Sequence, residues 1–277
     1  MKLSAEKYLR RFLSITPISV AVWRAVEAKY LATVKLRRPI LDIGCGFGEF
    51  AQGFFDAKID VGIDIAAKDL VMAKRCGKYK KLILADARDL PFKNGSFSSI
   101  FSISTLEHIT KPKKVIKEAY RVLRKNGVFV ATIETDAVDR QTFYRGLLEK
   151  IGLKSVSKFL LQKYNRLFNR HVIVSKHMWL KYFKDAGFSI ERSEDIISPN
   201  VVKIYDFFMI TAWPSQILKP FLGKRIVYRP AFIANILTKI FIKYVEEEAE
   251  GTNLFIVARK PNREISKTIS VHSRALS

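Results

Sequence analysis

One glycine-rich segment constrains the fold more than any other feature of the chain. Residues 40–43 (ILDI) form a short apolar run that ends in residues 44–48 (GCGFG). Glycines at every second position predict a tight turn from a strand into a helix, where the backbone can approach a ligand at the helix N-terminus. The loop by itself leaves one alternative open, a tight strand–helix turn that binds nothing.

Strands and helices alternate through the segment that contains this loop, residues 39–135. Apolar runs predict five strands and the stretches between them predict helices, with strands at 40–43, 61–64, 81–85, 99–103 and 128–133 and helices at 67–75 and 113–124. This spacing predicts a parallel sheet with helices on both faces. In such sheets, ligands bind outside the carboxyl ends of the strands.

Two acidic residues follow predicted strands near the glycine loop. Asp64 ends the second strand, 20 residues after Gly44, where a carboxylate can accept hydrogen bonds from both hydroxyls of a ribose. A dinucleotide enzyme also places an acid there, although its glycine pattern is GxGxxG rather than GxGxG. Asp86 ends the third strand, where it could accept from an exocyclic amine such as that of adenine. These two acids favour a ligand-binding loop over a bare turn.

With these positions the sequence resembles the class I S-adenosylmethionine-dependent methyltransferases, of the small-molecule type that includes the ubiquinone and menaquinone methyltransferases. The matching segments are LDIGCGFG (41–48), GID (62–64), ADARDLPF (85–92), STLEHI (104–109), EAYRVLRKNGVFVATI (118–133), AGFSIE (186–191) and NLFIVARKP (253–261). The resemblance implies an α/β fold, a Rossmann-like seven-stranded sheet, mostly parallel with the last strand antiparallel, carrying helical lid insertions. It also implies an enzyme that uses S-adenosylmethionine and releases S-adenosylhomocysteine.

The resemblance assigns roles to individual residues. Asp42 and the loop residues Gly44, Cys45, Gly46 and Gly48 would hold the methionine part of the cofactor. Asp64 would bind the ribose, Ile65 would pack on the adenine, Asp86 and Ala87 would meet the adenine edge, and Ser104 would lie beneath the sulfonium. The chain departs from the family at Phe97-Ser98, where the family has Phe-Asp. The departure puts in doubt the local contact that holds a helix to the fourth predicted strand.

The resemblance covers residues 39–135, 176–195 and 252–261, which sets the expected organisation of the chain. We expect a basic helical segment at 1–38, with a helix that begins near Pro17, and a methyltransferase domain at 39–261. Within that domain we expect helical insertions at about 134–175 and 196–250, and we expect residues 262–277 to be a basic, disordered tail. No segment reaches 18 uncharged apolar residues, so no membrane-spanning helix is predicted.

Methyl transfer depends mainly on in-line positioning, because the sulfonium methyl group is already electrophilic. A general base helps only when the acceptor is an unactivated hydroxyl or a charged amine. Our first candidates for that role are His108 and Glu134, and Glu107, His171 and His177 are further candidates. The alternative for His108 is structural, because Leu-Glu-His recurs in the family with varied substrates.

Two cysteines, Cys45 and Cys76, cannot form a disulfide framework, which favours a reducing compartment and a cytoplasmic protein. Neither follows the fourth strand, so a two-cysteine mechanism on RNA cytosine is disfavoured. The histidines show no spacing typical of metal ligands, and we predict that no metal is bound.

The charge of the chain favours an anionic partner. Its 49 Lys and Arg residues against 26 Asp and Glu residues give a net charge of +23, spread along the whole sequence. Nucleic acid, an anionic membrane surface or a phosphorylated substrate would each suit this charge. A lysine-rich proteome is the alternative explanation.

The insertion at 196–250 carries the clue to the methyl acceptor. After Pro230, apolar pairs recur every four residues from Phe232-Ile233 to Tyr244-Val245, which predicts a helix with a broad apolar face. An aromatic run at 207–213 precedes it, and the basic flanks are Lys203, Lys219, Lys224, Arg225 and Arg229. The insertion is either a lid packed on the fold or a surface that contacts an anionic membrane and a lipid-like acceptor.

We therefore predict methyl transfer to a small-molecule or lipid-like acceptor, at an anionic membrane surface on the cytoplasmic side. The rival is an RNA methyltransferase that acts on tRNA or rRNA, with tyrosines and phenylalanines stacked on unpaired bases. The apolar density of residues 201–245 exceeds what a phosphate-tracking groove needs, which makes nucleic acid the less favoured partner. A protein that binds the cofactor without transferring methyl groups is disfavoured by the intact motifs. The oligomeric state and the acceptor atom stay open.

Overall fold

A computed structural model of the chain describes residues 2–167, 170–208, 229–248 and 250–262. Its centre is a seven-stranded sheet with the strand order β3-β2-β1-β4-β5-β7-β6. The strands are β1 (Ile40–Ile43), β2 (Ile59–Asp64), β3 (Tyr79–Leu84), β4 (Phe97–Ile103), β5 (Leu123–Glu134), β6 (Ser189–Asp195) and β7 (Asn253–Arg259). Strands β1 to β5 pair in parallel, and β7 runs antiparallel to both β5 and β6. The predicted fold is confirmed.

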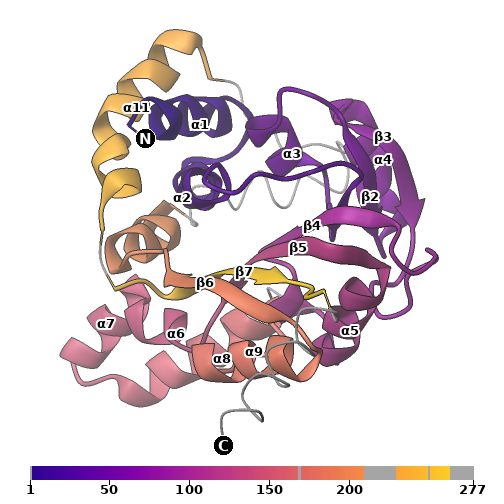
Figure 1. Cartoon of the computed structure of the whole chain (residues 1–277). Coiled ribbons are helices and arrows are strands. Elements are labelled where there is room, and N and C mark those ends of the chain that lie inside the picture. Colours follow the sequence, from indigo (N-terminus) through magenta and orange to yellow (C-terminus); the bar gives the residue numbers. More distant parts are fainter. Residues whose placement is uncertain (1, 168–169, 209–228, 249, 263–277) are drawn as a thin grey trace, which may run out of the picture.

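Helices cover both faces of this sheet (Figure 1). They are α1 (Lys2–Ile15), α2 (Ile18–Leu31), α3 (Glu49–Phe54), α4 (Ala67–Cys76), α5 (Pro112–Val122), α6 (Val138–Gln141), α7 (Phe143–Lys150), α8 (Lys154–Leu167), α9 (Lys176–Asp185) and α11 (Ala231–Glu246). A short 3-10 helix, η1 (Leu106–His108), follows β4, and residues 199–208 are also helical.

The alternation of side chains along each central strand divides the core into two layers. Phe101 of β4 and Val130 of β5 pack with apolar residues of α1, α2, α3 and α11. Their neighbours Ile100 and Phe129 point to the other face and pack with α5 and α9. All four residues of β1 are buried, as expected for a strand covered on both sides.

Several predicted boundaries are wrong by a few residues. Strand β5 begins at Leu123 rather than at 128, because Leu123 pairs with Phe97 before a register shift in β4. Strand β3 begins at Tyr79 rather than at 81, because Tyr79 pairs with Ile59 of β2. Strand pairing decides these ends, and pairing leaves no local signal in the sequence.

The helix of the insertion packs on the N-terminal helices. Lys29 of α2 donates a hydrogen bond to the backbone oxygen of Val245, at 2.7 Å, near the end of α11. Arg229, just before α11, donates to the backbone oxygens of Leu13 and Thr16 at the end of α1. Arg229 is therefore a structural cation here rather than one of the free basic flanks that the sequence suggested. Residues 209–228, which hold Trp213, Lys219, Lys224 and Arg225, lie outside the described residues, and so does the tail after residue 262.

Candidate functional site

The glycine loop joins the end of β1 to α3 through backbone conformations that favour glycine. Gly44, Gly46 and Gly48 have φ values of +76°, +50° and +76°. The backbone N–H groups of Gly44 and Cys45 both donate to the carbonyl oxygen of Ile63, which fixes the loop to the end of β2. A Cβ at Gly44 would lie 2.1 Å from Thr105 Cγ2, whereas a Cβ at Gly46 would meet no heavy atom within 4 Å. The loop is therefore packed at Gly44 and open at Gly46.

Asp64 lies beside the open part of the loop. Its carboxylate accepts from the backbone N–H of Gly46 at 2.8 Å and of Ala66 at 2.9 Å. A carboxylate offers about four lone-pair sites, so acceptor capacity for ribose hydroxyls remains. The next side chain, Ile65, is 67% exposed, and Leu84 at the end of β3 is 57% exposed. An apolar surface thus lies open where the sequence predicts the adenine.

Asp42 lies at the base of the loop and is buried. Its carboxylate accepts a hydrogen bond of 2.7 Å from the Tyr79 hydroxyl. Burial raises the pKa of Asp42 to about 7, although the bond from Tyr79 acts in the opposite direction. Burial and the neighbouring Asp42 also raise the pKa of the Cys45 thiol, which makes Cys45 a poor nucleophile.

Asp86 follows β3, as predicted, and it is already paired. Arg88 donates to its carboxylate from Nη2 at 2.7 Å, from Nε at 3.0 Å and from the backbone at 2.8 Å. These bonds hold the pKa of Asp86 below its usual value. An adenine amine would have to share this carboxylate with Arg88. The next residue, Ala87, is buried.

Comparison with known proteins decides the family. Residues 41–131 match the family described as Methyltransferase domain. An uncharacterized protein of Methanocaldococcus jannaschii is 32% identical over 164 residues, which are 59% of this chain and 71% of that protein. The chain is a class I S-adenosylmethionine-dependent methyltransferase.

Two further comparisons show what the chain is similar to in sequence and in fold. The demethylmenaquinone methyltransferase of Symbiobacterium thermophilum is 29% identical over 126 residues, which are 41% of this methyltransferase and half (50%) of that enzyme. The solved structure of a SAM-dependent methyltransferase from Thermotoga maritima has a TM-score of 0.56 at 18% identity, covering 88% of this chain and 91% of that one.

The cofactor of this methyltransferase is S-adenosylmethionine, which supplies an electrophilic sulfonium methyl group when bound. The residues at the ends of β1, β2 and β3 fit it. Gly46 faces open space, Asp64 keeps free acceptor capacity, and Ile65 leaves an apolar face exposed. The individual roles of the predicted cofactor residues stay predictions.

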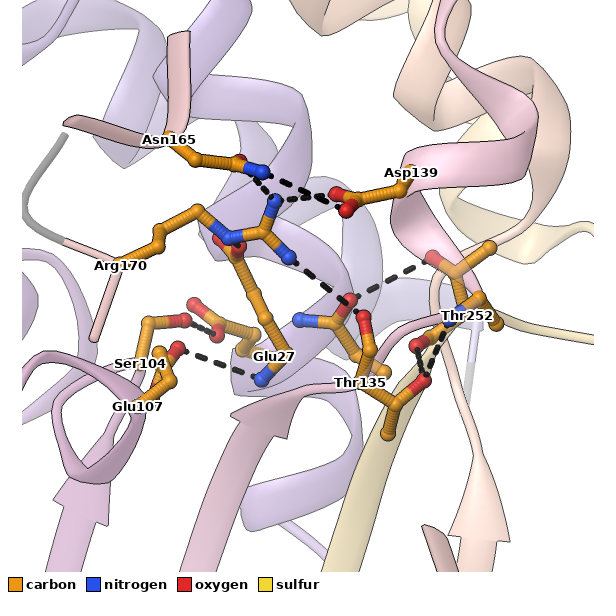
Figure 2. Close-up of polar contacts among 11 residues, drawn as sticks. Glu27, Ser104, Glu107, Thr135, Asp139, Asn165, Arg170 and Thr252 are labelled. Carbon is orange, nitrogen blue, oxygen red and sulfur yellow. Dashed lines mark hydrogen bonds and ion pairs between the residues drawn. The ribbon is translucent and has the colours of Figure 1, made fainter. Parts of the chain in front are cut away.

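We name the ends of β4 and β5 the acceptor side of the site, because the predicted cofactor residues other than Ser104 lie at the ends of β1 to β3. A residue of the N-terminal segment is bound there. Glu27 of α2 is fully buried, and one of its oxygens accepts from Ser104 Oγ at 2.6 Å (Figure 2). The same oxygen accepts from Thr132 Oγ1 at 2.7 Å. The other oxygen of Glu27 pairs with Arg24 at 2.7 Å. Ser104 has a φ of +46°, a left-handed conformation in a residue that follows β4 directly. Ser104 thus follows β4, as predicted, and donates to a carboxylate that sequence reasoning missed, while its place beneath the sulfonium stays a prediction.

Glu27, which sequence reasoning missed, leaves only a weak signal in the sequence. Glu27 lies in the otherwise apolar stretch of α2 (ISVAVWRAVEAKYL), and Arg24 precedes it by three residues. An ion pair at helical spacing within an apolar helix indicates a buried pair. The sequence does not indicate which distant residues that pair contacts.

A second group of buried charges lies where β5 ends. Glu107 of η1 is fully buried, and its Oε1 accepts from the backbone N–H of Glu134 at 3.2 Å. Its Oε2 has no hydrogen-bond partner among the described residues. Burial, together with the nearby Glu134, raises the pKa of Glu107 to about 8, so the carboxyl group is mostly neutral at pH 7.

Arg170 balances the charge of this group. Its Nε lies 2.8 Å from Glu134, its Nη1 bonds Asp139 of α6, and Nη1 also bonds Asn165 of α8 at 2.7 Å (Figure 2). Burial raises the pKa of Glu134 even though Arg170 acts to lower it. Arg170 therefore joins the end of β5 to α6 and α8.

The structure brings some of the predicted base candidates together and separates others. Glu107 and Glu134 are neighbours, and His108 shares η1 with Glu107. His177 is exposed, and so is the side chain of His171, whose backbone N–H donates to the carbonyl oxygen of Glu107. Catalytic roles for His108 and Glu134 stay predictions.

Metal-binding groups and membrane-spanning helices are both absent from the part of the chain that the structure describes. Within residues 2–167, 170–208, 229–248 and 250–262, no group of three or more His, Cys, Asp or Glu residues is placed to hold a metal ion. Within the same ranges, no helix has both the length and the apolar character that crossing a bilayer requires.

Proposed function

We propose that this methyltransferase transfers a methyl group to a lipid-like small molecule at the cytoplasmic face of an anionic membrane. The observation that carries the proposal is the outer face of α11. Phe232, Ile236 and Ile240 recur at four-residue intervals and are 65%, 54% and 50% exposed. Ile233 beside them is 36% exposed. Uncovered apolar rows of this kind on a soluble fold mark interaction sites.

The other face of α11 is packed on the protein. Ala234, Thr238, Phe241 and Val245 are buried, as a lid requires. The sequence left two alternatives for the insertion, a packed lid and a membrane-contacting surface. The first describes the inner face of α11, and we assign the second to its outer face. A helix that served only as a packed lid would have no reason to carry the outer row.

The positive charge of the protein also supports an anionic membrane as its partner. Lys239 and Lys243 are exposed on α11, and the whole chain carries +23. Each basic residue near an anionic bilayer contributes about 1 kcal/mol, and each large apolar side chain that is buried adds at most about 1.5–3 kcal/mol. Together these terms support reversible attachment without a spanning helix.

The chemistry of the exposed row on α11 favours a lipid-like acceptor over RNA. The Symbiobacterium relative is named for demethylmenaquinone, which supports a small-molecule acceptor here. Three of the four exposed residues are isoleucines, which cannot stack on bases as aromatic rings do.

The test is labelled transfer. Purified protein is incubated with S-adenosylmethionine that carries a deuterated methyl group, together with lipid, RNA and polar-metabolite extracts in separate reactions. Mass spectrometry is expected to find the label in the lipid extract. Label confined to RNA would overturn the proposal and establish the rival function, and label confined to polar metabolites would remove the membrane from it.

A further inference from the structure

We propose that the hairpin formed by α7 and α8, residues 143–167, is a second membrane-binding arm that inserts apolar side chains into an anionic phospholipid bilayer. The proposal rests on the proposed function, because it assigns a further contact to the same membrane-bound enzyme. Nothing in the family resemblance covers these residues.

Exposed apolar side chains gather on this hairpin. Six of them are between 43% and 62% exposed: Leu147, Ile151, Leu153, Val156, Phe159 and Leu160. On α8, Val156 and Leu160 are four residues apart and Phe159 lies between them, so they share one side of the helix. Phe159 also lies beneath a cation, since Lys163 Nζ is 5.5 Å from the centre of its ring. The hairpin therefore presents an amphipathic surface that the described part of the fold leaves uncovered.

The charge of the hairpin indicates which partner binds its exposed apolar surface. It carries six basic residues and one acidic residue, and the basic residues are Arg145, Lys150, Lys154, Lys158, Lys163 and Arg166. The single acid, Glu149, is already bound to Arg145 at 2.7 Å. Apolar side chains bordered by cations match the boundary between acyl chains and anionic headgroups. Two copies of so basic a surface would repel each other, which argues against a second copy of this chain as the occupant.

The hairpin and α11 are linked through the helical residues 199–208. The ring of Phe207 lies 6.1 Å from that of Phe143 on α7, and the ring of Phe208 lies 5.8 Å from that of Phe241 on α11. The backbone N–H of Phe143 also donates to the buried carboxylate of Asp206 at 2.9 Å. Figure 1 shows α11, residues 199–208 and α7 along one edge of the molecule. The two apolar surfaces can therefore meet one bilayer.

The base of the hairpin adjoins the acceptor side of the site. Arg145 of α7 donates to the backbone oxygen of Asp139 at 2.9 Å, and Asp139 binds Arg170, which pairs with Glu134 at the end of β5. A lipid drawn from a bilayer beneath the hairpin would approach the protein near the ends of β4 and β5.

The experiment compares three variants at exposed positions, two of them double and one single. The first carries Ile151→Ser and Phe159→Ser on the hairpin, the second carries Phe232→Ser and Ile236→Ser on α11, and Val71→Ser on α4 is the matched control, because Val71 is 55% exposed. Flotation is measured with vesicles of phosphatidylcholine alone and of phosphatidylcholine mixed with phosphatidylglycerol. Unchanged binding of S-adenosylmethionine verifies that each variant is folded.

The hairpin variant is expected to bind mixed vesicles about tenfold more weakly than the wild type, while Val71→Ser binds normally. A separate variant, Phe159→Trp, is expected to gain fluorescence that brominated phospholipids quench in mixed vesicles only. If the hairpin variant floats like the control and brominated lipid quenches nothing, the second arm is refuted. The proposed function survives that result as long as the α11 variant loses binding.

Two other outcomes also decide whether the hairpin is a membrane-binding arm. If the hairpin variant loses vesicle binding and the α11 variant does not, the second arm stands and the contact through α11 falls. If the hairpin variant changes the oligomeric state or RNA binding but not flotation, the occupant is a second copy or RNA, and the second arm is overturned.

Discussion

The cofactor side and the acceptor side of this sheet are built differently. At the ends of β1 to β3, Asp64 bonds the backbone of Gly46 and Ala66, and the surface beside it is open. At the ends of β4 and β5, Glu27 bonds Ser104 and Thr132, which are 77 and 105 residues away in sequence, and the carboxylate is sealed from solvent. The cofactor side is shaped by short motifs, whereas the acceptor side is assembled by distant segments.

The largest effect is expected from removing Glu27, which tests whether distant segments hold the acceptor side together. Glu27→Ala leaves the half-buried Arg24 without this partner, and Ser104 and Thr132 lose their acceptor. Losing the ion pair and leaving two hydroxyl groups without their acceptor costs about 3–5 kcal/mol in total, so the free energy of unfolding should fall by that amount in denaturant titration. Glu27→Gln keeps an acceptor oxygen and should lose less. An unchanged midpoint in Glu27→Ala would show that α2 does not hold the acceptor side together.

The cofactor side is tested by Asp64→Ala. Loss of two charge-assisted bonds to the ribose should weaken S-adenosylmethionine binding by about 2–4 kcal/mol, measured by calorimetry. Asp89→Ala is the matched control, because Asp89 is an exposed carboxylate three residues beyond Asp86. Equal affinity in both variants would remove Asp64 from the site.

The protonation state of the buried carboxyl group of Glu107 can be tested by pH. The folded-state pKa of Glu107, about 8, lies above its ordinary value of 4.5, so the folded protein holds a proton that the unfolded chain releases. Stability from this group is complete below about pH 4.5 and is lost as the pH rises towards 8, by at most about 1.4 kcal/mol per pH unit. Glu107→Gln should show a flatter pH dependence of unfolding over that range. Parallel pH curves for the two proteins would mean that Glu107 is ionised when folded.

The smallest expected effect is that of a chelator. We predict that activity does not change in EDTA, because the sequence offers no ligand spacing for a metal on either side of the sheet. Activity lost in EDTA and restored by Mg²⁺ would contradict this prediction.

The sequence predicted the positions of the glycine loop, Asp64 and Asp86 in the fold because their signals are local, while their roles towards the cofactor stay predictions. The glycine loop, Asp64 and Asp86 each follow a strand within a few residues, and the resemblance supplied their roles. Glu27 and Arg170 were missed because their partners lie on other segments of the chain. The periodicity of α11 predicted an apolar face but could not separate the packed residues, such as Phe241, from the exposed ones, such as Phe232.

One measurement tests most directly that this fold binds its cofactor and its membrane through separate parts. Binding of S-adenosylmethionine and binding to anionic vesicles are measured on the same two proteins, Asp64→Ala and the double variant Phe232→Ser, Ile236→Ser. We predict that the first loses the cofactor and keeps the vesicles, and that the second keeps the cofactor and loses the vesicles. If either variant loses both, or if the α11 variant floats like the wild type, cofactor binding and membrane contact do not reside on separate sides of this fold.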